Sequence, residues 1–296
     1  SHDGRNAYAK YIRTCFKEKK VSLFDEKYSL YKKEFEGYLT RFVYSLEGKT
    51  LSENLIRSVS YSLLAEGKRI RPVLFFATLD ALNVDYTKYS DFAVAIELIH
   101  NYSLVHDDLP AMDNDDFRRG KPTNHKLFGE AMALLAGDAM LNLAYELLLN
   151  MCVKDASLIK PSKILSEAVG YTGMIGGQAV DIELDNYPKD VRTATYIDEN
   201  KTSKLITAPV ECASVIANSA ETVEYCSFAD NLGHLFQLTD DLIDGDGMVN
   251  IIGRDETIKL VQERYDNCKN ALSRIKNNEF FCELTEKIKN RYEKNA

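Results

Sequence analysis

The chain has 296 residues and a formal net charge of −8, with 45% hydrophobic and 28% charged residues. The acidic excess argues against a nucleic-acid partner, because nucleic-acid phosphates are bound by basic faces. Few prolines, no tryptophan and abundant Leu, Ala, Glu and Lys favour helices over a sheet-rich fold. A chain of this length forms one large domain or two ordinary ones.

The six cysteines are scattered, with no CxxC pair and no His/Cys spacing that suits zinc. We therefore expect reduced cysteines and a cytoplasmic protein. No apolar run approaches the roughly 18 residues that a membrane span needs, and no signal peptide is seen. We expect no stable membrane insertion. Residues 1–30 are interpreted as an N-terminal extension or an added segment, and residues 31–296 as one functional domain.

Apolar residues recur at helical spacing along most of the chain, whereas strand-like alternation is hardly seen. The clearest helical segments are 54–67, 91–108, 129–150, 202–220 and 229–244. Breaks are expected at Gly67 to Pro72, at Pro110, at 118–124, around Pro161 and at 185–190, and none is long enough for a flexible linker. The sequence predicts an all-α, single-domain bundle of about ten mostly antiparallel helices around a central cavity.

Two of these apolar segments end in aspartate clusters, "HDDLPAMDNDD" (106–116) and "FQLTDDLID" (236–244). They contribute six candidate metal ligands: Asp107, Asp108, Asp113, Asp240, Asp241 and Asp244. For either cluster taken alone, a helix cap or a solvated patch is as good an explanation as a metal site. Two clusters at the ends of core helices, however, can meet across a cavity and hold hard cations such as magnesium.

Helical geometry constrains how each cluster is presented. At about 100° per residue, Gln237, Asp241 and Asp244 fall on one stripe of a helix. In the first cluster an uninterrupted helix would turn Asp113 away from Asp107. Pro110 disrupts helical hydrogen bonding, and a two-residue bulge there could return Asp113 to the Asp107 side.

Basic and polar residues accompany the acidic clusters. They are Lys68, Arg69 and Arg71 in a turn closed by Pro72, His100 two helical turns before Asp107, Arg118 and Arg119, and Lys201 with Thr202. Any one of these is more often a solvated charge than a ligand. Together they describe a site that binds anions in two ways, through metal and through Lys and Arg directly.

Five motifs, "GKRIRP", "HDDLPAMDNDDFRRGKPTNH", "GGQAVD" (176–181), "KT" (201–202) and "FQLTDDLID", occur in the order and spacing of the trans-polyprenyl diphosphate synthases. The chain resembles this family from about residue 30 to near its C-terminus. The Pro-Ala insertion in the first acidic motif is similar to the bacterial and plastid type, especially bacterial farnesyl diphosphate synthases. DDxxD alone would be weak evidence, whereas five ordered motifs are highly specific.

The resemblance implies an isoprenoid synthase fold and a homodimer. It also implies a magnesium-dependent, head-to-tail condensation of isopentenyl diphosphate with dimethylallyl or geranyl diphosphate, giving farnesyl diphosphate. Geranylgeranyl or geranyl diphosphate is the alternative product. About three Mg²⁺ ions are implied per active site, for which Mn²⁺ can substitute.

The resemblance also assigns roles to individual residues. Direct metal ligands are Asp107, Asp113 and Asp240, with Asp108, Asp241 and Asp244 behind them. Isopentenyl diphosphate is gripped by Lys68, Arg71, His100 and Arg119. The allylic diphosphate and the catalytic step involve Arg118, Lys201, Thr202 and Gln237. Gln178 and Asp181 orient Lys201.

Product length is expected to depend on the helix that carries Asp107. In the family, a bulky residue five places before the first aspartate stops growth at fifteen carbons, and Tyr102 occupies that position, next to Ser103 on the Asp107 face. An ideal helix places Tyr102 well round from Asp107, so this role comes from the resemblance. The alternative is that Tyr102 is an ordinary core or dimer contact.

The segment after the second acidic motif departs from the family pattern. Family members continue with a glycine- and lysine-bearing loop that closes over the diphosphates, whereas "DGDGMVNIIGRDETIKL" (244–260) passes almost directly to the next helix. Either the loop is shortened or the sequence omits part of it, and a true deletion would weaken closure.

Two other functions share some of these features. A terpene cyclase would not need Lys68, Arg71 and His100, and its usual Asn/Ser/Glu second motif is absent. A non-catalytic synthase subunit typically loses aspartates from one cluster, and both are complete here.

Overall fold

Helix α5 (Ser90–Asp107) lies at the centre of the structure because its first turns are apolar on nearly every side. Phe92, Ile96 and Ile99 are completely buried there. A helix that is apolar all round is expected inside a bundle. The most extensive partner of α5 is α7 (Glu130–Lys154), which follows it in the chain. The cavity-facing residues near the end of α5 are therefore held by a rigid core helix.

The computed structural model describes residues 22–293 of the chain. In this range twelve α-helices have seven or more residues, somewhat more than expected. The others are α2 (Leu23–Tyr44), α3 (Glu53–Leu63), α4 (Ile70–Ala81), α8 (Ile159–Val169), α9 (Met174–Ile182), α10 (Val191–Ile197), α11 (Lys204–Ile216), α12 (Thr222–Asp244), α14 (Arg254–Leu272) and α15 (Glu279–Lys289). Two shorter helices, α6 (Asn124–Phe128) and α13 (Met248–Ile252), join them.

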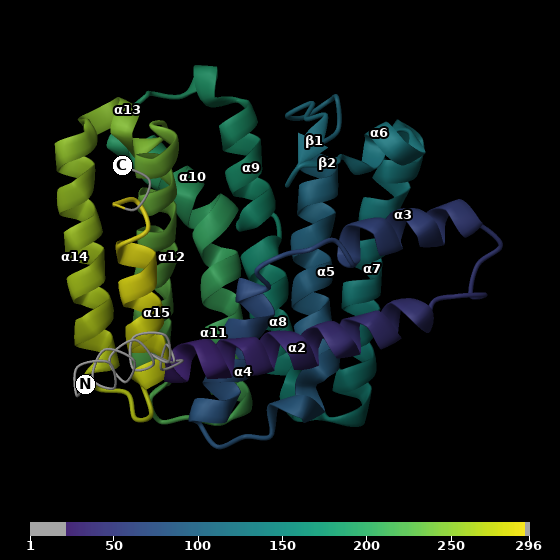
Figure 1. Cartoon of the computed structure of the whole chain (residues 1–296), viewed down its shortest axis with the longest axis horizontal. Helices are drawn as coiled ribbons and strands as arrows, with labels where there is room; N and C mark the ends of the chain where they lie inside the picture. Colours follow the sequence, from purple (N-terminus) through teal and green to yellow (C-terminus); the bar gives the residue numbers. More distant parts are fainter. Residues whose placement is uncertain (1–21, 294–296) are drawn as a thin grey trace, which may run out of the picture.

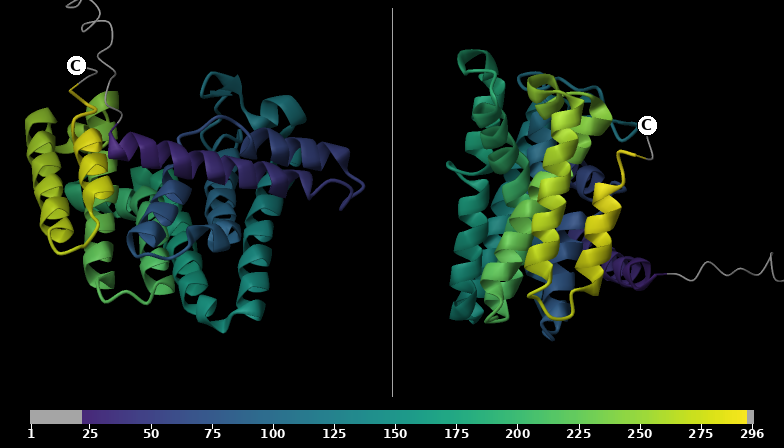
Figure 2. Two further views of the ribbon diagram at one scale, coloured as in Figure 1. Left: turned by 60° about the horizontal axis from the view of Figure 1, so that its bottom comes forward. Right: turned by 90° about the vertical axis from the view of Figure 1, so that its left-hand side faces the viewer.

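The longer helices share a common direction. Figure 1 shows α5, α7, α9, α11, α12 and α14 running in the same general direction, with α2 lying across part of this set. In the turned views of Figure 2, α2 lies on one face of this bundle. It contacts α4, α5 and α15, and so ties the first and last parts of the described chain together. The predicted all-α bundle is confirmed.

Helix α2 begins before the expected domain boundary at residue 31. Ser22 caps the helix by accepting a hydrogen bond from the backbone N–H of Asp25 (3.1 Å). Phe24 and Tyr31 are buried in the core, and the Tyr31 hydroxyl donates to Asp80 (2.6 Å). Residues 22–30 are thus part of the folded unit, and residues 1–21 lie outside the described part of the chain.

The break expected at 118–124 contains a β-hairpin. Strands β1 (Phe117–Arg118) and β2 (Lys121–Pro122) pair antiparallel. Arg119 and Gly120 between them both have positive φ, 52° and 74°, as a tight two-residue hairpin turn requires. The hairpin fixes the direction in which Arg118 and Arg119 leave the backbone.

The turn expected from Gly67 to Pro72 is shorter than predicted. Helix α4 begins at Ile70, so Arg71 and Pro72 already lie in its first turn, where a proline costs no helical hydrogen bond. Arg69 precedes the helix in the left-handed conformation (φ 55°). Pro72 therefore starts the helix rather than closing the turn.

Helix α7 contradicts the expectation that no segment is apolar enough to span a membrane. Its 25 residues have the length and the apolar composition of a membrane-spanning helix. In the structure, 33% of its most apolar 18-residue stretch is buried. A single match of this kind is weak evidence, because core helices of bundles also meet it. The exposed residues of α7 include Leu134, Leu135, Leu149 and Val153.

The five cysteines among residues 22–293 are all free thiols, as expected. Cys15, the sixth, lies outside the described residues.

Candidate functional site

The first aspartate cluster lies where α5 ends. The helix stops at Asp107, and the backbone N–H of Asp113 donates to the carbonyl oxygen of Asp107 (2.8 Å). The expected return of Asp113 toward Asp107 is confirmed, but it is achieved by a turn that ends the helix and not by a bulge within a continuing helix. Pro110 lies in that turn, where the helix has already stopped.

Two polar side chains hold this cluster in place. Arg118, from the hairpin, donates from Nε (2.9 Å) and Nη2 (2.7 Å) to the buried carboxylate of Asp108. Gln178 on α9 donates from Nε2 to Oδ1 of Asp107 (3.0 Å). Burial raises the pKa of Asp107 to about 6, with Asp113 adding to the rise and Lys201 opposing it. The carboxylates of Asp107 and Asp113 are crowded in a way that a divalent cation would relieve.

The second cluster lies on the last turns of α12. Gln237 donates from Nε2 to Oδ1 of Asp241 (2.9 Å), as expected for residues on one stripe. The backbone N–H of Met248 donates to Oδ2 of the same carboxylate (2.8 Å). Gly247 makes this approach possible, since a Cβ there would lie 2.5 Å from that oxygen. Asp240 points to a different partner, forming an ion pair with Arg291 (2.5 Å).

A cavity of about 950 Å³ lies between the two clusters. The first cluster contributes Asp107 and Asp113 to its wall, and the second contributes Asp241 and Asp244. The other polar side chains that line it include Arg118, Asp181, Asp190, Asp198, Lys201, Thr202, Gln237 and Asp246. We call this space the acidic cavity. The meeting of the two clusters across a cavity, predicted from the sequence, is therefore what the structure shows.

The residues of the acidic cavity suit a hard cation in kind, because carboxylate oxygens are the ligands that Mg²⁺ prefers. Burial raises the pKa of Asp108, Asp240 and Asp241 as well as that of Asp107. Within residues 22–293, however, no three acidic, His or Cys side chains converge closely enough to form a finished metal centre. A Mg²⁺ ion bound here would take the rest of its coordination from water or from phosphate oxygens, since Mg²⁺ usually keeps several such ligands beside one or two carboxylates.

Lys201 and Thr202 lie in a π-helical turn, Asp198–Ser203, a rare form that is frequent at functional sites. Gly177 on α9 admits the backbone of this turn, since a Cβ at that position would lie 2.5 Å from the Lys201 nitrogen. The Lys201 ammonium donates to Asp181 (2.5 Å). Asp181 therefore orients Lys201 as predicted. The prediction that Gln178 also does so is wrong, because Gln178 bonds Asp107.

A second cavity of about 570 Å³ runs from the end of α5 between α7 and α9. Its apolar lining includes Tyr102, Met112, Leu141, Met174, Ile182 and Leu205. We call it the apolar cavity. Tyr102 is 6% exposed and packs edge-on against His106, and its burial raises its pKa to about 12. Tyr102 and Ser103 thus both face the cavity, although an ideal helix would have turned Tyr102 away from Asp107.

The two cavities meet. Leu104, Asp107, Lys201 and Thr202 line both of them. A ligand with a charged head and an apolar tail can therefore place its head in the acidic cavity and its tail in the apolar cavity, with the bond between them beside these residues.

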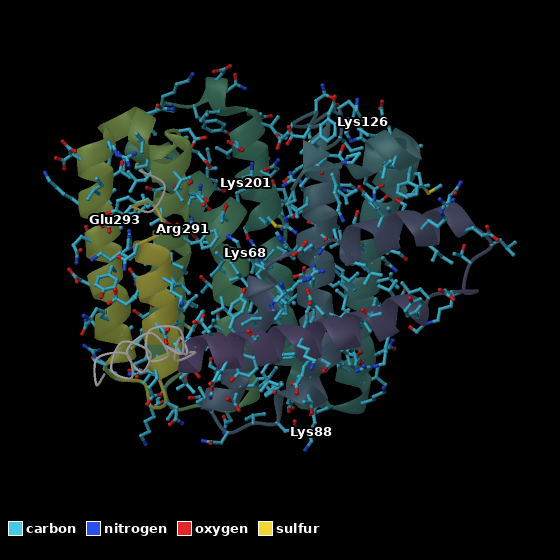
Figure 3. The ribbon with its side chains drawn as sticks, viewed as in Figure 1. Lys68, Lys88, Lys126, Lys201, Arg291 and Glu293 are labelled. Carbon is cyan, nitrogen blue, oxygen red and sulfur yellow. The ribbon has the colours of Figure 1, made fainter. Side chains whose placement is uncertain are left out.

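Basic residues for a second anion lie beside the apolar cavity and in the segments near it. Nη1 of Arg71 lies 3.4 Å from Nε2 of His100, and both line the apolar cavity. Burial, followed by the charge of Arg71, lowers the pKa of His100 well below its usual range, so His100 is neutral. Arg119 donates to the carbonyl oxygen of Glu66 (3.0 Å). Figure 3 shows Lys68 and Lys201 toward the middle of the molecule, and Lys88 and Lys126 at its periphery.

Arg69, in contrast, is a structural residue. Its side chain is 3% exposed and forms an ion pair with the buried Glu97 (2.6 Å). It also donates to the carbonyl oxygens of Leu63 and Ala65. The three basic residues of "GKRIRP" therefore differ in their surroundings. Arg69 is buried in an ion pair, Arg71 lines the apolar cavity and Lys68 is exposed.

The residues of this site that were not predicted from the sequence include Gly177, Asp190, Asp198, Asp246 and Arg291. Asp198 lines the acidic cavity, and burial raises its pKa to about 8, with Asp241 and Asp181 contributing. A glycine pair inside a helical motif was a usable signal for Gly177, because glycine in a helix often marks a close approach. No local pattern distinguishes Asp198 or Arg291 from solvated charges.

Comparisons with known proteins identify the family. The sequence profile described as "Polyprenyl synthetase" matches residues 52–258. Farnesyl diphosphate synthase of Geobacillus stearothermophilus is 43% identical over 231 residues, which cover 75% of this chain and 76% of that protein. Geranylgeranyl pyrophosphate synthase 7 of Arabidopsis thaliana is 42% identical over 193 residues, or 63% of this chain and 56% of that protein.

A solved structure agrees. The geranyltransferase from Legionella pneumophila superposes with a TM-score of 0.85 at 32% identity, covering 93% of this chain and 99% of that chain. The chain therefore belongs to the polyprenyl synthetase family. The predicted family and isoprenoid synthase fold are confirmed, and these relatives support the prediction of a short-chain prenyltransferase.

Proposed function

We propose that the protein is a magnesium-dependent farnesyl diphosphate synthase, which condenses isopentenyl diphosphate head to tail with dimethylallyl or geranyl diphosphate. The observation that carries this proposal is the junction of the acidic and apolar cavities at Asp107, Lys201 and Thr202. That junction is where a prenyl diphosphate would place the carbon–oxygen bond that breaks. The name of the Geobacillus relative supports the fifteen-carbon product.

Magnesium would be held by carboxylates of the two clusters, with Asp107, Asp113 and Asp240 as direct ligands and Asp108, Asp241 and Asp244 behind them. When bound, it would neutralise charge on the departing diphosphate. Asp240 needs to leave Arg291 to take up this role. The carboxylate chemistry fits the metal, and Mn²⁺ is expected to substitute.

The cationic side chains act on the allylic diphosphate directly. Lys201 is oriented by Asp181 and lies on the wall shared by the two cavities, where it can stabilise the departing oxygen. Arg118 lines the acidic cavity while it holds Asp108, so it can bind the same head group. Gln237 and Thr202 also line this cavity. From there they would contact the reacting end of the substrate.

Isopentenyl diphosphate would be gripped by Lys68, Arg71, His100 and Arg119. The neutral imidazole of His100 leaves one ring nitrogen free to donate to a phosphate oxygen, and Arg71 beside it supplies the charge. The bound alkene then attacks the allylic carbon as its bond to the diphosphate oxygen breaks. The departed diphosphate, held by Lys201 and Arg118, accepts the proton that is lost, which restores a neutral product chain.

Product length follows from the depth of the apolar cavity. Tyr102 is buried and lines this cavity, so it can act as the floor that stops growth at fifteen carbons. Each further isoprene unit would need the space that its ring fills. A geranylgeranyl or geranyl product is the alternative, and the Arabidopsis relative is named for the former.

We also infer a homodimer. Helix α7 exposes Leu134, Leu135, Leu149 and Val153, and burial of such residues against a second copy is the usual fate of an exposed apolar helix face. Size-exclusion chromatography coupled to light scattering should give twice the mass of the chain. A cytoplasmic location and the absence of membrane insertion remain predictions.

The function is tested by incubating the purified protein with dimethylallyl and isopentenyl diphosphates, with and without magnesium. We expect farnesyl diphosphate only when magnesium is present, as identified by chromatography after dephosphorylation. Failure to consume isopentenyl diphosphate would contradict the proposal. Release of a cyclic hydrocarbon from geranyl or farnesyl diphosphate alone would identify a terpene cyclase instead, and inactivity without an added partner would identify a non-catalytic subunit.

A further inference from the structure

Arg291, in the segment after α15, contacts the second aspartate cluster from outside the acidic cavity. Its Nη2 atom lies 2.5 Å from Oδ1 of Asp240. The same guanidinium donates from Nε to the hydroxyl of Thr239 (2.7 Å) and from Nη2 to the carbonyl oxygen of Phe236 (2.6 Å). It also lies 4.1 Å from the centre of the Phe236 ring. Four contacts to one turn of α12 make this a fitted position and not a chance surface contact.

The backbone around Arg291 is anchored. Tyr292, the next residue, is 9% exposed and belongs to the hydrophobic core, whereas Glu293 is exposed. The Arg291 side chain itself is 19% exposed, and that of Asp240 is 37% exposed. An ion pair between partly buried groups that are both fixed is stronger than one between mobile surface side chains.

The pairing changes what the acidic cavity offers to a cation. Among the described residues that line the cavity, α12 supplies Gln237, Asp241 and Asp244, while Asp240 is held by Arg291. Lys68 is close enough to act electrostatically on Asp240 as well. A carboxylate neutralised in this way contributes less to the attraction of a divalent cation.

We propose that Arg291 is an internal counter-ion that holds Asp240 away from metal until a divalent cation displaces it, so that this residue sets the metal affinity of the substrate-free protein. The inference deepens the proposed function and rests on it only in taking Asp240 as a metal ligand. Arg291 is then a positioning residue that acts through Asp240. A purely structural role, in which Arg291 only fastens the C-terminal segment to α12, predicts no effect on metal affinity.

The test measures Mn²⁺ binding to the full chain without substrates, from the decrease of the free Mn²⁺ signal in electron paramagnetic resonance. Removing the competing charge in Arg291→Gln should tighten binding about five- to tenfold. Lys289→Gln is the matched control, because Lys289 lies 4.3 Å from the Tyr265 ring centre and has no contact with Asp240. Its Mn²⁺ affinity should stay within about twofold of the wild type.

A double-mutant cycle separates this competition from a general electrostatic effect. If Arg291 acts through Asp240, then Arg291→Gln should leave Mn²⁺ affinity unchanged in an Asp240→Asn background. Arg291→Lys keeps the positive charge but loses the hydrogen bond from Nε to Thr239. This lysine variant is used in place of Arg291→Gln if Arg291→Gln does not fold. We expect it to bind Mn²⁺ about two- to threefold more tightly than the wild type.

Unchanged or weaker Mn²⁺ binding in Arg291→Gln would overturn the proposal, as would an equal gain in the Asp240→Asn background. Absence of saturable binding in both the wild type and the variant would also overturn it. These outcomes are independent of catalysis, because no prenyl substrate is present. A protein that condenses no isopentenyl diphosphate would still report whether Arg291 controls the metal affinity.

Discussion

The two aspartate clusters resemble each other in composition but differ in how they are held. In each, an arginine binds one carboxylate while two others face the acidic cavity. Arg118 comes from a hairpin only ten residues after Asp108 and itself lines the cavity. Arg291 comes from the last described turn of the chain and binds Asp240 from outside the cavity.

This difference indicates a division of roles. The first cluster is a local unit, with its helix end, its hairpin and its arginine contiguous in sequence. The second cluster depends on a distant segment, so its state is linked to the packing of α15 and the residues after it. If the clusters act as a pair, loss of a carboxylate from either one should impair the reaction to a similar extent.

Loss of a cavity-facing carboxylate from either cluster should have the largest effect. We expect Asp107→Asn and Asp241→Asn each to lower kcat by about a thousandfold, because each removes charge that holds the cation. Steady-state assays with saturating magnesium measure this. Asp155→Asn, at an exposed helix cap that lines neither cavity, is the control and should keep full activity. A large loss for only one cluster would show that the clusters do not act together.

The wall between the clusters should be the next most sensitive feature. In Gly177→Ala the new methyl group would lie 2.5 Å from the backbone nitrogen of Lys201, so the π-helical turn must shift. We expect kcat to fall about 10- to 100-fold, with a loss of about 1–3 kcal/mol in the free energy of unfolding.

The matched substitution is Gly37→Ala on α2, where the nearest neighbour is 3.7 Å away. It should leave activity unchanged and slightly stabilise its helix. Wild-type activity in Gly177→Ala would mean that the position of Lys201 does not matter for the reaction.

Product length should respond to the apolar cavity without a comparable loss of rate. Tyr102→Ala removes the buried ring and should give products of twenty carbons or more, with kcat within about tenfold of the wild type. Tyr102→Phe keeps the ring and should still give fifteen carbons. Product analysis by chain length measures both. An unchanged profile in Tyr102→Ala would leave Tyr102 as an ordinary core residue.

The smallest expected effect concerns the pH dependence of stability. Burial, with the charges of Asp241 and Asp181, raises the pKa of Asp198 to about 8 in the folded protein, whereas an aspartate in the unfolded chain has a pKa of about 4. The folded state therefore binds more protons between these values, and its stability falls as the pH rises. Asp198→Asn should remove this slope and stabilise the metal-free protein by about 1–3 kcal/mol at pH 8.

Urea unfolding of the metal-free protein at pH 5 and pH 8 measures this difference. Asp190→Asn is a useful contrast, because hydrogen bonds to the Thr193 segment lower the pKa of Asp190. Its contribution to stability is present above the unfolded pKa and is lost only as the pH falls. An equal slope in the wild type and in Asp198→Asn would show that Asp198 is ionised in the folded protein.

Much of this protein was decided by local sequence. Helical periodicity predicted the bundle, and the stripe of Gln237 and Asp241 is the hydrogen-bonded pair found on α12. Among the residues that the ordered motifs predicted, Asp107, Asp113, Asp241 and Asp244 line the acidic cavity. Asp240, Lys68 and Arg119 line neither of the two cavities. Periodicity did not reveal that α2 begins at Leu23, since only packing against α4 and α15 makes that segment a core helix.

Other features were decided only by tertiary structure. Gln178 was expected beside Lys201 but bonds Asp107, and Asp240 was expected to face the metal but bonds Arg291. In both cases the choice of partner depends on how separate helices pack, and several partners of similar chemistry were available. Sequence determines which groups a helix presents and on which face. Which of them meet across a cavity is set by the packing of the whole chain, because the energy of a contact depends on distances that no local pattern encodes.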